Sequence, residues 1–360
     1  MKKRYKLNLK LLSPVHIGTG EVYEPMNFVM DKIKVKTKSG EIKTEGRMFV
    51  FDEFEFFKNL NPNQKAEFTK LASDISARAV FGLHSFVKTH KDIAKTIAHK
   101  KILAKNEIYE YYDEKCGKIV QSKGGGFDNS RQNFKEFNKF AIEKTYTSPN
   151  SNKALILGSS LKGAISTAYQ EMLYKEKKIS KTKITQNSAS EQINEIFKNL
   201  LLSDSTEAKG TFVGKAINFK RFKESKQPLY KFIEAILPKQ NLECEITING
   251  SENLDISRIA RSCNDHYLPI FESLFKGELA HYELSDKFKD EFADLKPQKN
   301  QFLLCVGKHG GARAVSIDGL RNIKIMRGKG KAPSFEDEET TSWLINSLPF
   351  GWVLCEYNEI

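Results

Sequence analysis

Apolar and polar residues alternate along several stretches of the chain, as they do in half-buried strands. Residues 5–12 follow this pattern, and residues 242–249 are its clearest example. Shorter apolar runs predict further strands at 33–37, 47–51, 200–203, 212–219, 301–306 and 352–357. Apolar residues at helical spacing predict helices at 161–178, 229–237 and 256–292, and a helical turn at 342–347.

The stretch from about residue 52 to 147 has a different character. Phe54, Phe57 and Leu60 begin a series of apolar residues at helical spacing, which predicts a mostly helical insertion. Three consecutive glycines at 124–126 indicate a surface linker, because neither a preceding strand nor a following Gly-Lys-Thr/Ser completes a phosphate-binding loop. Residues 179–190, rich in Lys, Ser and Thr, indicate a second loop.

A strand, a turn and a helix are predicted to meet at residues 155–168. Gly158 suits the turn, and Ser159 or Ser160 can cap the helix. Lys162 would then lie at the positive end of the helix dipole, with no acid following before Glu171. Two interpretations are open: the corner binds a polyanion, as helix N-termini can, or the helix is an ordinary one whose lysine points into water.

The first predicted strand runs into a loop that carries a histidine. Pro14 ends the strand, and Gly18 and Gly20 permit a tight loop with close backbone approach. His16 is a candidate general base or a ring on which a nucleobase stacks. A packed structural histidine fits equally well, since no second catalytic residue type lies in the same loop.

A second glycine-rich loop follows the apolar run at 301–306. It combines flexible backbone with basic side chains, so it can approach an anion closely. Its candidate anion-binding residues are Lys308, His309, Gly310, Gly311 and Arg313. The spacing of a nucleotide-hydrolase phosphate loop is incomplete, which argues against that class.

The charge distribution points to a polyanionic partner. The formal net charge is +13, yet residues 332–360 contain no Lys or Arg, so the basic excess lies upstream. At 215–223, lysines and an arginine alternate with Phe219 and Phe222, as in grooves that bind single-stranded nucleic acid. A hairpin edge protected from aggregation by lysines has the same pattern. The acidic end suggests a different contact, such as a basic protein neighbour.

Several classes of protein are disfavoured. No apolar run is long enough to span a bilayer and no signal-peptide core is evident, so we expect a cytoplasmic protein without membrane contact. The five cysteines are scattered, which indicates neither a disulfide framework nor a zinc site. We therefore expect no cofactor and no bound metal.

Four motifs, taken together, resemble one family. They are residues 11–20 with Ser13-Pro14-Val15-His16-Ile17-Gly18, the Gly158-Ser159-Ser160-Leu161-Lys162-Gly163-Ala164 corner, Leu201-Leu202-Ser203-Asp204-Ser205, and the glycine loop at 307–311. The same order occurs in the RAMP superfamily of CRISPR-Cas proteins, and the chain most resembles the fifth-subunit family of type III-A (Csm) effector complexes. Leu157 stands where family members typically have proline.

The resemblance implies an α+β fold of two ferredoxin-like (RRM-like) domains. The first, residues 1–250, would be a RAMP domain with a large helical insertion at about 52–147. The second, residues 251–360, would be a smaller, divergent RRM-like domain that contains the glycine-rich loop.

The resemblance also implies a function. The chain would be a non-catalytic RNA-binding subunit that caps the filament end, binds the 3′ part of the CRISPR RNA and has a role in its 3′-end maturation. Its partners would be CRISPR RNA and the backbone subunits of the complex, with host nucleases as a further candidate. The alternative is a metal-independent CRISPR RNA endoribonuclease that uses His16 or His309, with Lys162 or Lys308 as the cation.

Patterns and resemblance together yield one set of candidate RNA-binding residues, none assigned to catalysis or to a metal: His16, Gly18, Gly20, Gly158, Ser159, Ser160, Lys162, Gly163, Lys308, His309, Gly310, Gly311 and Arg313.

Overall fold

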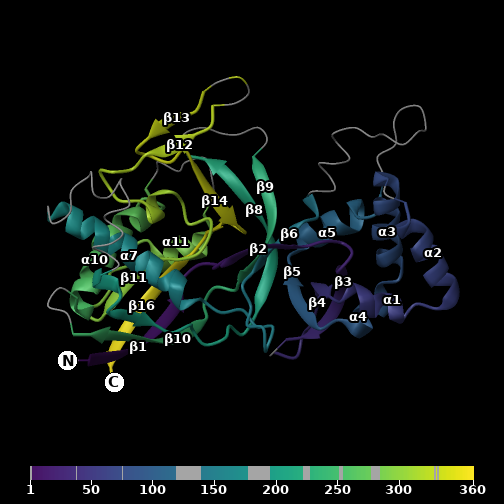
Figure 1. Cartoon of the computed structure of the whole chain (residues 1–360), viewed down its shortest axis with the longest axis horizontal. Helices are drawn as coiled ribbons and strands as arrows, with labels where there is room; N and C mark the ends of the chain where they lie inside the picture. The colour runs from purple at the N-terminus through teal and green to yellow at the C-terminus, as the bar shows by residue number, and fades with distance from the viewer. Residues whose placement is uncertain are drawn as a thin grey trace.

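The computed structural model describes residues 2–37, 39–74, 76–118, 139–176, 195–221, 228–250, 254–276, 284–327, 330 and 332–360. Two sheets organise these residues (Figure 1). The first is antiparallel, in the order β11 (Gln301–Cys305), β16 (Trp352–Glu359), β1 (Lys2–Leu11), β10 (Asn241–Asn249) and β7 (Leu200–Leu202). The predicted linker at 124–126 and loop at 179–190 lie outside the described residues.

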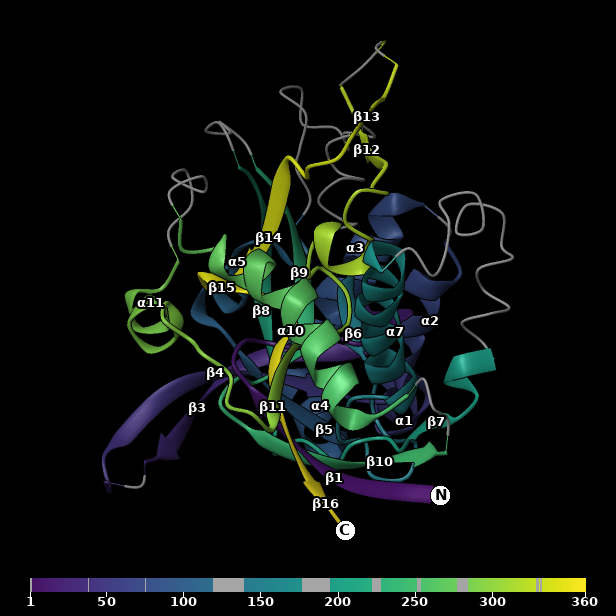
Figure 2. The ribbon, with the colours of Figure 1, turned by 90° about the vertical axis from the view of Figure 1, so that its left-hand side faces the viewer.

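The first sheet buries one face, as the alternating pattern predicted. Tyr5, Leu7, Leu9 and Leu11 of β1 are buried, and so are the alternate apolar residues of β10. Helices α7 (Gly158–Lys175) and α10 (Ile256–Glu272) lie side by side over this face and share its core (Figure 2). Burial of these apolar faces against each other is what holds this layer together.

The order of these elements is that of a ferredoxin-like unit. Along the chain they run β1, α7, β7, β10, α10 and β16, a β-α-β-β-α-β arrangement. In the sheet the four strands lie in the order β16-β1-β10-β7, and β11 extends the edge next to β16. The α+β class and the ferredoxin-like expectation therefore hold for this sheet.

The second sheet is longer and mixed. Its strands are β2 (Gly18–Tyr23), β6 (Ile142–Thr145), β9 (Leu229–Ile236), β8 (Thr211–Lys220), β5 (Lys100–Ala104), β4 (Ile42–Val50) and β3 (Phe28–Lys36), in that order. β14 (Thr341–Ile345) pairs with both β8 and β15 (Leu348–Pro349). β12 (Ile323–Ile325) and β13 (Ser334–Glu336) form a separate pair.

The helical insertion is confirmed over much of its predicted length. It contains α1 (Glu53–Lys58), α2 (Pro62–Ala72), α3 (Ala77–Thr89), α4 (Lys91–Ile97) and α5 (Asn106–Lys115), but also β5 and β6. Helices cover β3 and β4 on both sides: Phe28 and Met30 pack with residues of α5, whereas Val29 packs with residues of α1, α3 and α4. Double coverage explains why three consecutive residues of β3 are all buried.

Two helix predictions were wrong. Residues 229–237 form strand β9, and 342–347 fall mostly in strand β14. Phe232 to Ile236 of β9 are all buried, because both faces of the strand are covered. Phe232 packs with residues of α5, whereas Ile233 and Ala235 pack with Ile345 and Phe350. Such a short continuous apolar run does not distinguish a buried strand from a helix. The predicted helix at 256–292 comprises α10 and α11 (Asp286–Phe292), with residues 277–283 outside the described part.

The division into domains at residue 250 stays a prediction. The first sheet takes β1, β7 and β10 from one side of that position and β11 and β16 from the other. Within the described ranges, no helix has the length and apolar character needed to cross a bilayer. All five cysteines are buried and free.

Candidate functional site

His16 lies in the loop between β1 and β2, with its side chain fully buried. Its Nδ1 is 2.7 Å from the carbonyl oxygen of Glu234 in β9. A carbonyl only accepts, so Nδ1 is the donor, and Nε2 of the neutral ring carries the lone pair. Burial lowers the pKa of His16 to about 4, so the ring is neutral at physiological pH.

His309 lies on the glycine-rich loop after β11, and its ring stacks on that of His16 with 5.8 Å between centroids. Its backbone φ of +73° is unusual for a residue with a side chain. The two loops are joined directly, since Lys308 N donates to the His16 carbonyl oxygen at 2.9 Å. A Cβ atom at Gly307 would collide with that same oxygen, which explains the glycine there.

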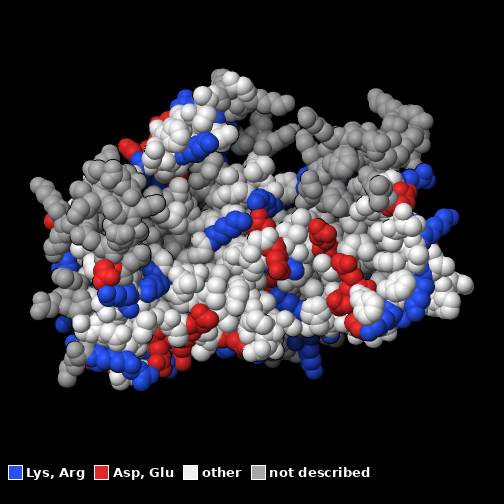
Figure 3. Space-filling model, in the orientation of Figure 1, with Lys and Arg blue, Asp and Glu red and all other residues white. Residues whose placement is uncertain are grey.

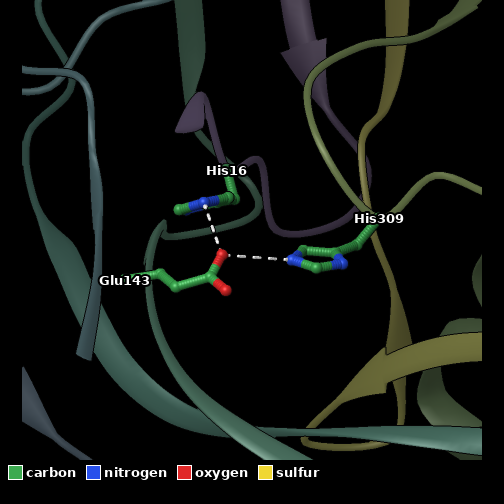
Figure 4. Close-up of side chains that lie close together, drawn as sticks. All are labelled: His16, Glu143 and His309. Atoms are coloured by element: carbon green, nitrogen blue, oxygen red, sulfur yellow. Dashed lines mark ion pairs between the residues drawn. The ribbon is translucent and has the colours of Figure 1, made fainter. Parts of the chain in front are cut away.

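Glu143 of β6, which no sequence pattern indicated, lies between the two histidines (Figure 4). Its Oε2 is 3.7 Å from His16 Nε2, 3.6 Å from His309 Nε2 and 2.8 Å from Lys308 Nζ. Its Oε1 is 2.5 Å from Lys231 Nζ. His309, together with these two ammonium groups, holds the pKa of Glu143 well below its usual range despite burial, so the carboxylate is charged.

The structure thus brings together three predicted residues, His16, Lys308 and His309, and adds Glu143. Gly18 borders this cluster, because a Cβ there would lie 3.3 Å from His16 Nε2. Gly20, at φ +85°, has open space where its Cβ would lie. In the described part of the chain, His16, Glu143 and His309 are the group whose donor atoms are close enough to share a metal ion.

At the predicted corner around Gly158, a carboxylate of the same chain binds the first backbone N–H group of the helix. Gly158 N donates to Asp204 Oδ1 at 2.7 Å, and helix α7 has no cap from its own serines, which corrects the prediction for Ser159 and Ser160. A Cβ at Gly158 would lie 2.5 Å from Leu202 O, so glycine permits close packing on β7. Lys162 does not simply point into water, because Nζ donates to Leu200 O at 2.8 Å. An ammonium has three N–H donors, so contact of Lys162 with an anion stays a prediction.

A carboxylate of the same chain also binds backbone N–H groups of the glycine-rich loop. The backbone N–H groups of Ala312 and Arg313 donate to Glu339 Oε2 at 2.6 and 3.2 Å. Gly311 is adjacent, since a Cβ there would lie 2.8 Å from the same oxygen, and Gly310 packs against Cys305. Arg313 itself pairs with Glu338. Part of the acidic C-terminal stretch therefore neutralises groups of its own chain.

A surface hollow of about 890 Å³ lies beside Glu143; we call it the β8–β9 hollow, lined by Val22, Lys139, Ala141, Glu143, Lys215, Ile217, Pro228, Leu229, Tyr230, Lys231 and Phe232. Lys215 Nζ lies 4.9 Å and Lys139 Nζ 5.4 Å from the centre of the Tyr230 ring. A flat ring flanked by cations is what single-stranded RNA grooves use.

RNA binding by 215–223 stays a prediction, and the residues of this stretch that the structure describes do not gather on one surface. Lys215 reaches the β8–β9 hollow, but Arg221 is buried against Glu339 at 3.1 Å, and Phe222 and Lys223 lie outside the described residues. The edge-strand alternative is wrong, because β8 has strands on both sides. On the face in Figure 3, basic and acidic side chains are interspersed over the described residues.

No family model matches this chain, and no curated protein matches it. Solved structures do. One is a chain of a type III-A Csm–crRNA–target RNA ternary complex, with a TM-score of 0.56, 16% identity, and coverage of 99% of this chain and 100% of that chain. Another is Csm5 of T. onnurineus, with a TM-score of 0.57, 15% identity, and coverage of 96% and 99%. At these identities the likeness shows the fold, over nearly the whole chain.

Proposed function

We propose that this chain is a non-catalytic, RNA-binding, Csm5-like subunit of a type III-A CRISPR effector complex. It caps the end of the filament, binds the 3′ part of the CRISPR RNA and has a role in 3′-end maturation. The observation that carries the proposal is the fold likeness, which extends over nearly all of this chain and of both solved chains. One of those chains comes from a complex with crRNA and target RNA. Host nucleases gain no support as partners.

The β8–β9 hollow is the surface that best fits RNA. Tyr230 offers a stacking face, and Lys139 and Lys215 lie where they can meet backbone phosphates. The predicted corner and glycine loop fit less well, because carboxylates of the chain already occupy their backbone N–H groups. RNA contact by the remaining exposed positions there, such as Ser159 and Gly163, stays a prediction.

The geometry does not favour the endoribonuclease alternative. His16 and His309 do converge with Lys308, as that mechanism requires. However, the His16 side chain is fully buried and that of His309 is only 7% exposed, so neither ring reaches a substrate 2′-OH at the surface. RNA cleavage by the purified chain that is lost in His309→Ala would contradict the non-catalytic assignment.

The proposal is tested by co-expression with the other subunits of a type III-A complex and a CRISPR RNA. We expect the chain to co-purify with those subunits and with RNA, and its omission to change the RNA 3′ ends. A complex of normal composition and normal 3′ ends without this chain, or failure of the chain to join it, would overturn the proposal.

Point variants test the β8–β9 hollow. We expect Lys215→Glu to weaken binding of single-stranded RNA and to reduce the slope of log K against log salt by about 0.7 if one phosphate contact is lost. Tyr230→Ala should cost about 1–3 kcal/mol per stacked base without changing the slope. Lys34→Glu, an exposed change on β3, is the matched control. Affinity equal to wild type in both hollow variants would exclude this surface.

Ser159→Glu tests the corner better than a change at Lys162, because Ser159 is exposed whereas Lys162 bonds to β7. Weaker RNA binding with unchanged stability would support the predicted contact. Unchanged affinity would remove the corner from the RNA interface.

A further inference from the structure

Two acceptor atoms, His16 Nε2 and Glu143 Oε2, face each other at the centre of the His16–Glu143–His309 cluster. His16 donates through Nδ1, so its Nε2 presents a lone pair toward the ionised Glu143 at 3.7 Å. His16 Nε2 and His309 Nε2 are buried, and neither has a hydrogen-bond partner among the described residues. An unpaired buried acceptor such as His16 Nε2 is costly, so the arrangement calls for an electrophile between this nitrogen and Glu143 Oε2.

The spacing of the three donor atoms suits a metal ion. All three lie within 4.8 Å of one another, and each imidazole nitrogen lies 3.6–3.7 Å from Glu143 Oε2. Ligands on a tetrahedral zinc ion at about 2.0–2.1 Å are separated by about 3.4 Å, so small side-chain shifts would close the site.

The surroundings also resemble those of a metal ligand set. A metal-binding histidine almost always donates its other ring N–H to a carbonyl or carboxylate, and His16 does so to Glu234 O. Lys231 bonds to Oε1 of Glu143, which leaves Oε2 directed at the histidines. Two imidazole nitrogens and one carboxylate oxygen match the preference of zinc rather than that of magnesium or calcium.

We propose that His16, Glu143 and His309 form a binding site for a divalent transition metal ion, Zn²⁺ in particular. The ion would join the β1–β2 loop, strand β6 and the loop after β11, and so connect the first sheet to the second. Its role is structural, since burial of His16 leaves little room for a substrate.

Lys308 is the competitor for this site. Its ammonium lies 2.8 Å from Glu143 Oε2, on the oxygen that the ion needs. The side chain is half exposed, so it can swing into water and leave Oε2 to the ion. Removal of this ammonium should therefore strengthen metal binding, whereas a purely structural ion-pair network gives no such effect.

The test uses the full chain, stripped of metal with a chelator and dialysed. Zn²⁺ binding is measured by competition with a chromophoric chelator, and Co²⁺ binding by its visible absorption, with Mg²⁺ as a contrast. We expect one Zn²⁺ per chain, a Co²⁺ spectrum typical of low coordination number, and no competition by Mg²⁺.

Variants locate the ion. Loss of an outer-shell partner alone typically costs about 10–100-fold in metal affinity. Glu143→Gln and His309→Ala change direct ligands, so each should weaken Zn²⁺ binding by at least about tenfold. Lys308→Met should bind more tightly than wild type. His90→Gln is the control, because His90 also contacts a backbone carbonyl through Nδ1 but lies on α3's C-terminal end. Circular dichroism checks folding, and the isosteric Glu143→Gln keeps the test valid if His309→Ala does not fold.

Absence of Zn²⁺ binding by the wild-type chain would overturn the proposal. So would equal affinity in wild type, Glu143→Gln and His309→Ala, which would indicate adventitious surface binding. Unchanged or weaker affinity in Lys308→Met would refute placement of the ion at Oε2.

Discussion

Three carboxylates of this chain bond to backbone N–H groups of distant segments. Asp204 accepts from Gly158, Glu339 from Ala312 and Arg313, and Glu171 from Asp318. Each does for the backbone what an external phosphate would do. Two of these sites, the corner at Gly158 and the glycine-rich loop, are those where the sequence patterns predicted an anion. The patterns indicated the backbone donors, but they could not reveal that the acceptor is a carboxylate remote in the same sequence.

Glu143 illustrates the same limit at the candidate site. His16, Lys308 and His309 were each predicted from their glycine-containing loops. Glu143 has no such signal, because a single acidic residue in a short strand is unremarkable until the fold places it between two histidines.

Glu171 provides a prediction for the pH dependence of stability. Burial raises its pKa, but hydrogen bonds with His266, Lys175 and the backbone of Asp318 outweigh this and lower the pKa to about 2. Since the folded pKa lies below the ordinary 4.5, the carboxylate stabilises the fold above pH 4.5, by about 3 kcal/mol, and this is lost as pH falls toward 2.

Urea unfolding of Glu171→Gln checks this. We expect the difference in free energy of unfolding from wild type to be large at pH 7 and to shrink between about pH 4.5 and 2. Glu272→Gln, on a half-exposed side chain, should show little difference at either pH. A difference independent of pH would contradict the assignment.

At the scale of elements, the period of apolar residues identified elements that bury one face, whereas runs buried on both faces were predicted correctly for β11 and β16 but wrongly for β9. β1, β10 and α7 each bury one face, and their periodicity identified them. β9 is buried on both faces, so its period is lost and a helix was predicted instead. Pairing of β14 with β8 depends on partners far away in sequence, which no local pattern contains.

Helix α7 offers a matched pair of glycines. At Gly158 an added methyl group would meet Leu202 O and Ser203 O, whereas at Gly163 nothing lies within 4 Å. We expect Gly158→Ala to destabilise the chain by about 1–3 kcal/mol through overpacking. Gly163→Ala should stabilise it by up to about 1 kcal/mol through helix propensity. Thermal unfolding measures both, and equal effects of the two changes would disprove the close packing of the corner on β7.

At the scale of the whole molecule, one stretch of chain, residues 341–359, supplies strands to both sheets. β14 pairs with β8 in the second sheet, and β16 lies between β11 and β1 in the first. The ferredoxin-like expectation was right for the first sheet, and the division at residue 250 stays a prediction. No local pattern in the sequence indicates that β16 fills the fourth position of the first sheet. Only the completed fold shows this.

This arrangement predicts a single cooperative unfolding transition. We expect the calorimetric and van't Hoff enthalpies to agree, because neither sheet is complete without residues 341–359. A fragment of residues 1–250 should not fold, since it lacks β16 and β11. Two separate transitions, or a folded 1–250 fragment, would instead support independent domains divided at residue 250.

The position of β16 has a consequence for synthesis. Ser13 Oγ accepts a hydrogen bond from Trp352 N, a contact that spans 339 residues. During translation, β1 emerges long before β16, so this edge of β1 stays unpaired in the meantime, whereas β10 can pair with the other edge earlier. Such long-range pairing makes folding slow and leaves an unpaired strand exposed meanwhile. Nascent chains should therefore depend on chaperones, and truncated products should aggregate before they can compete for assembly.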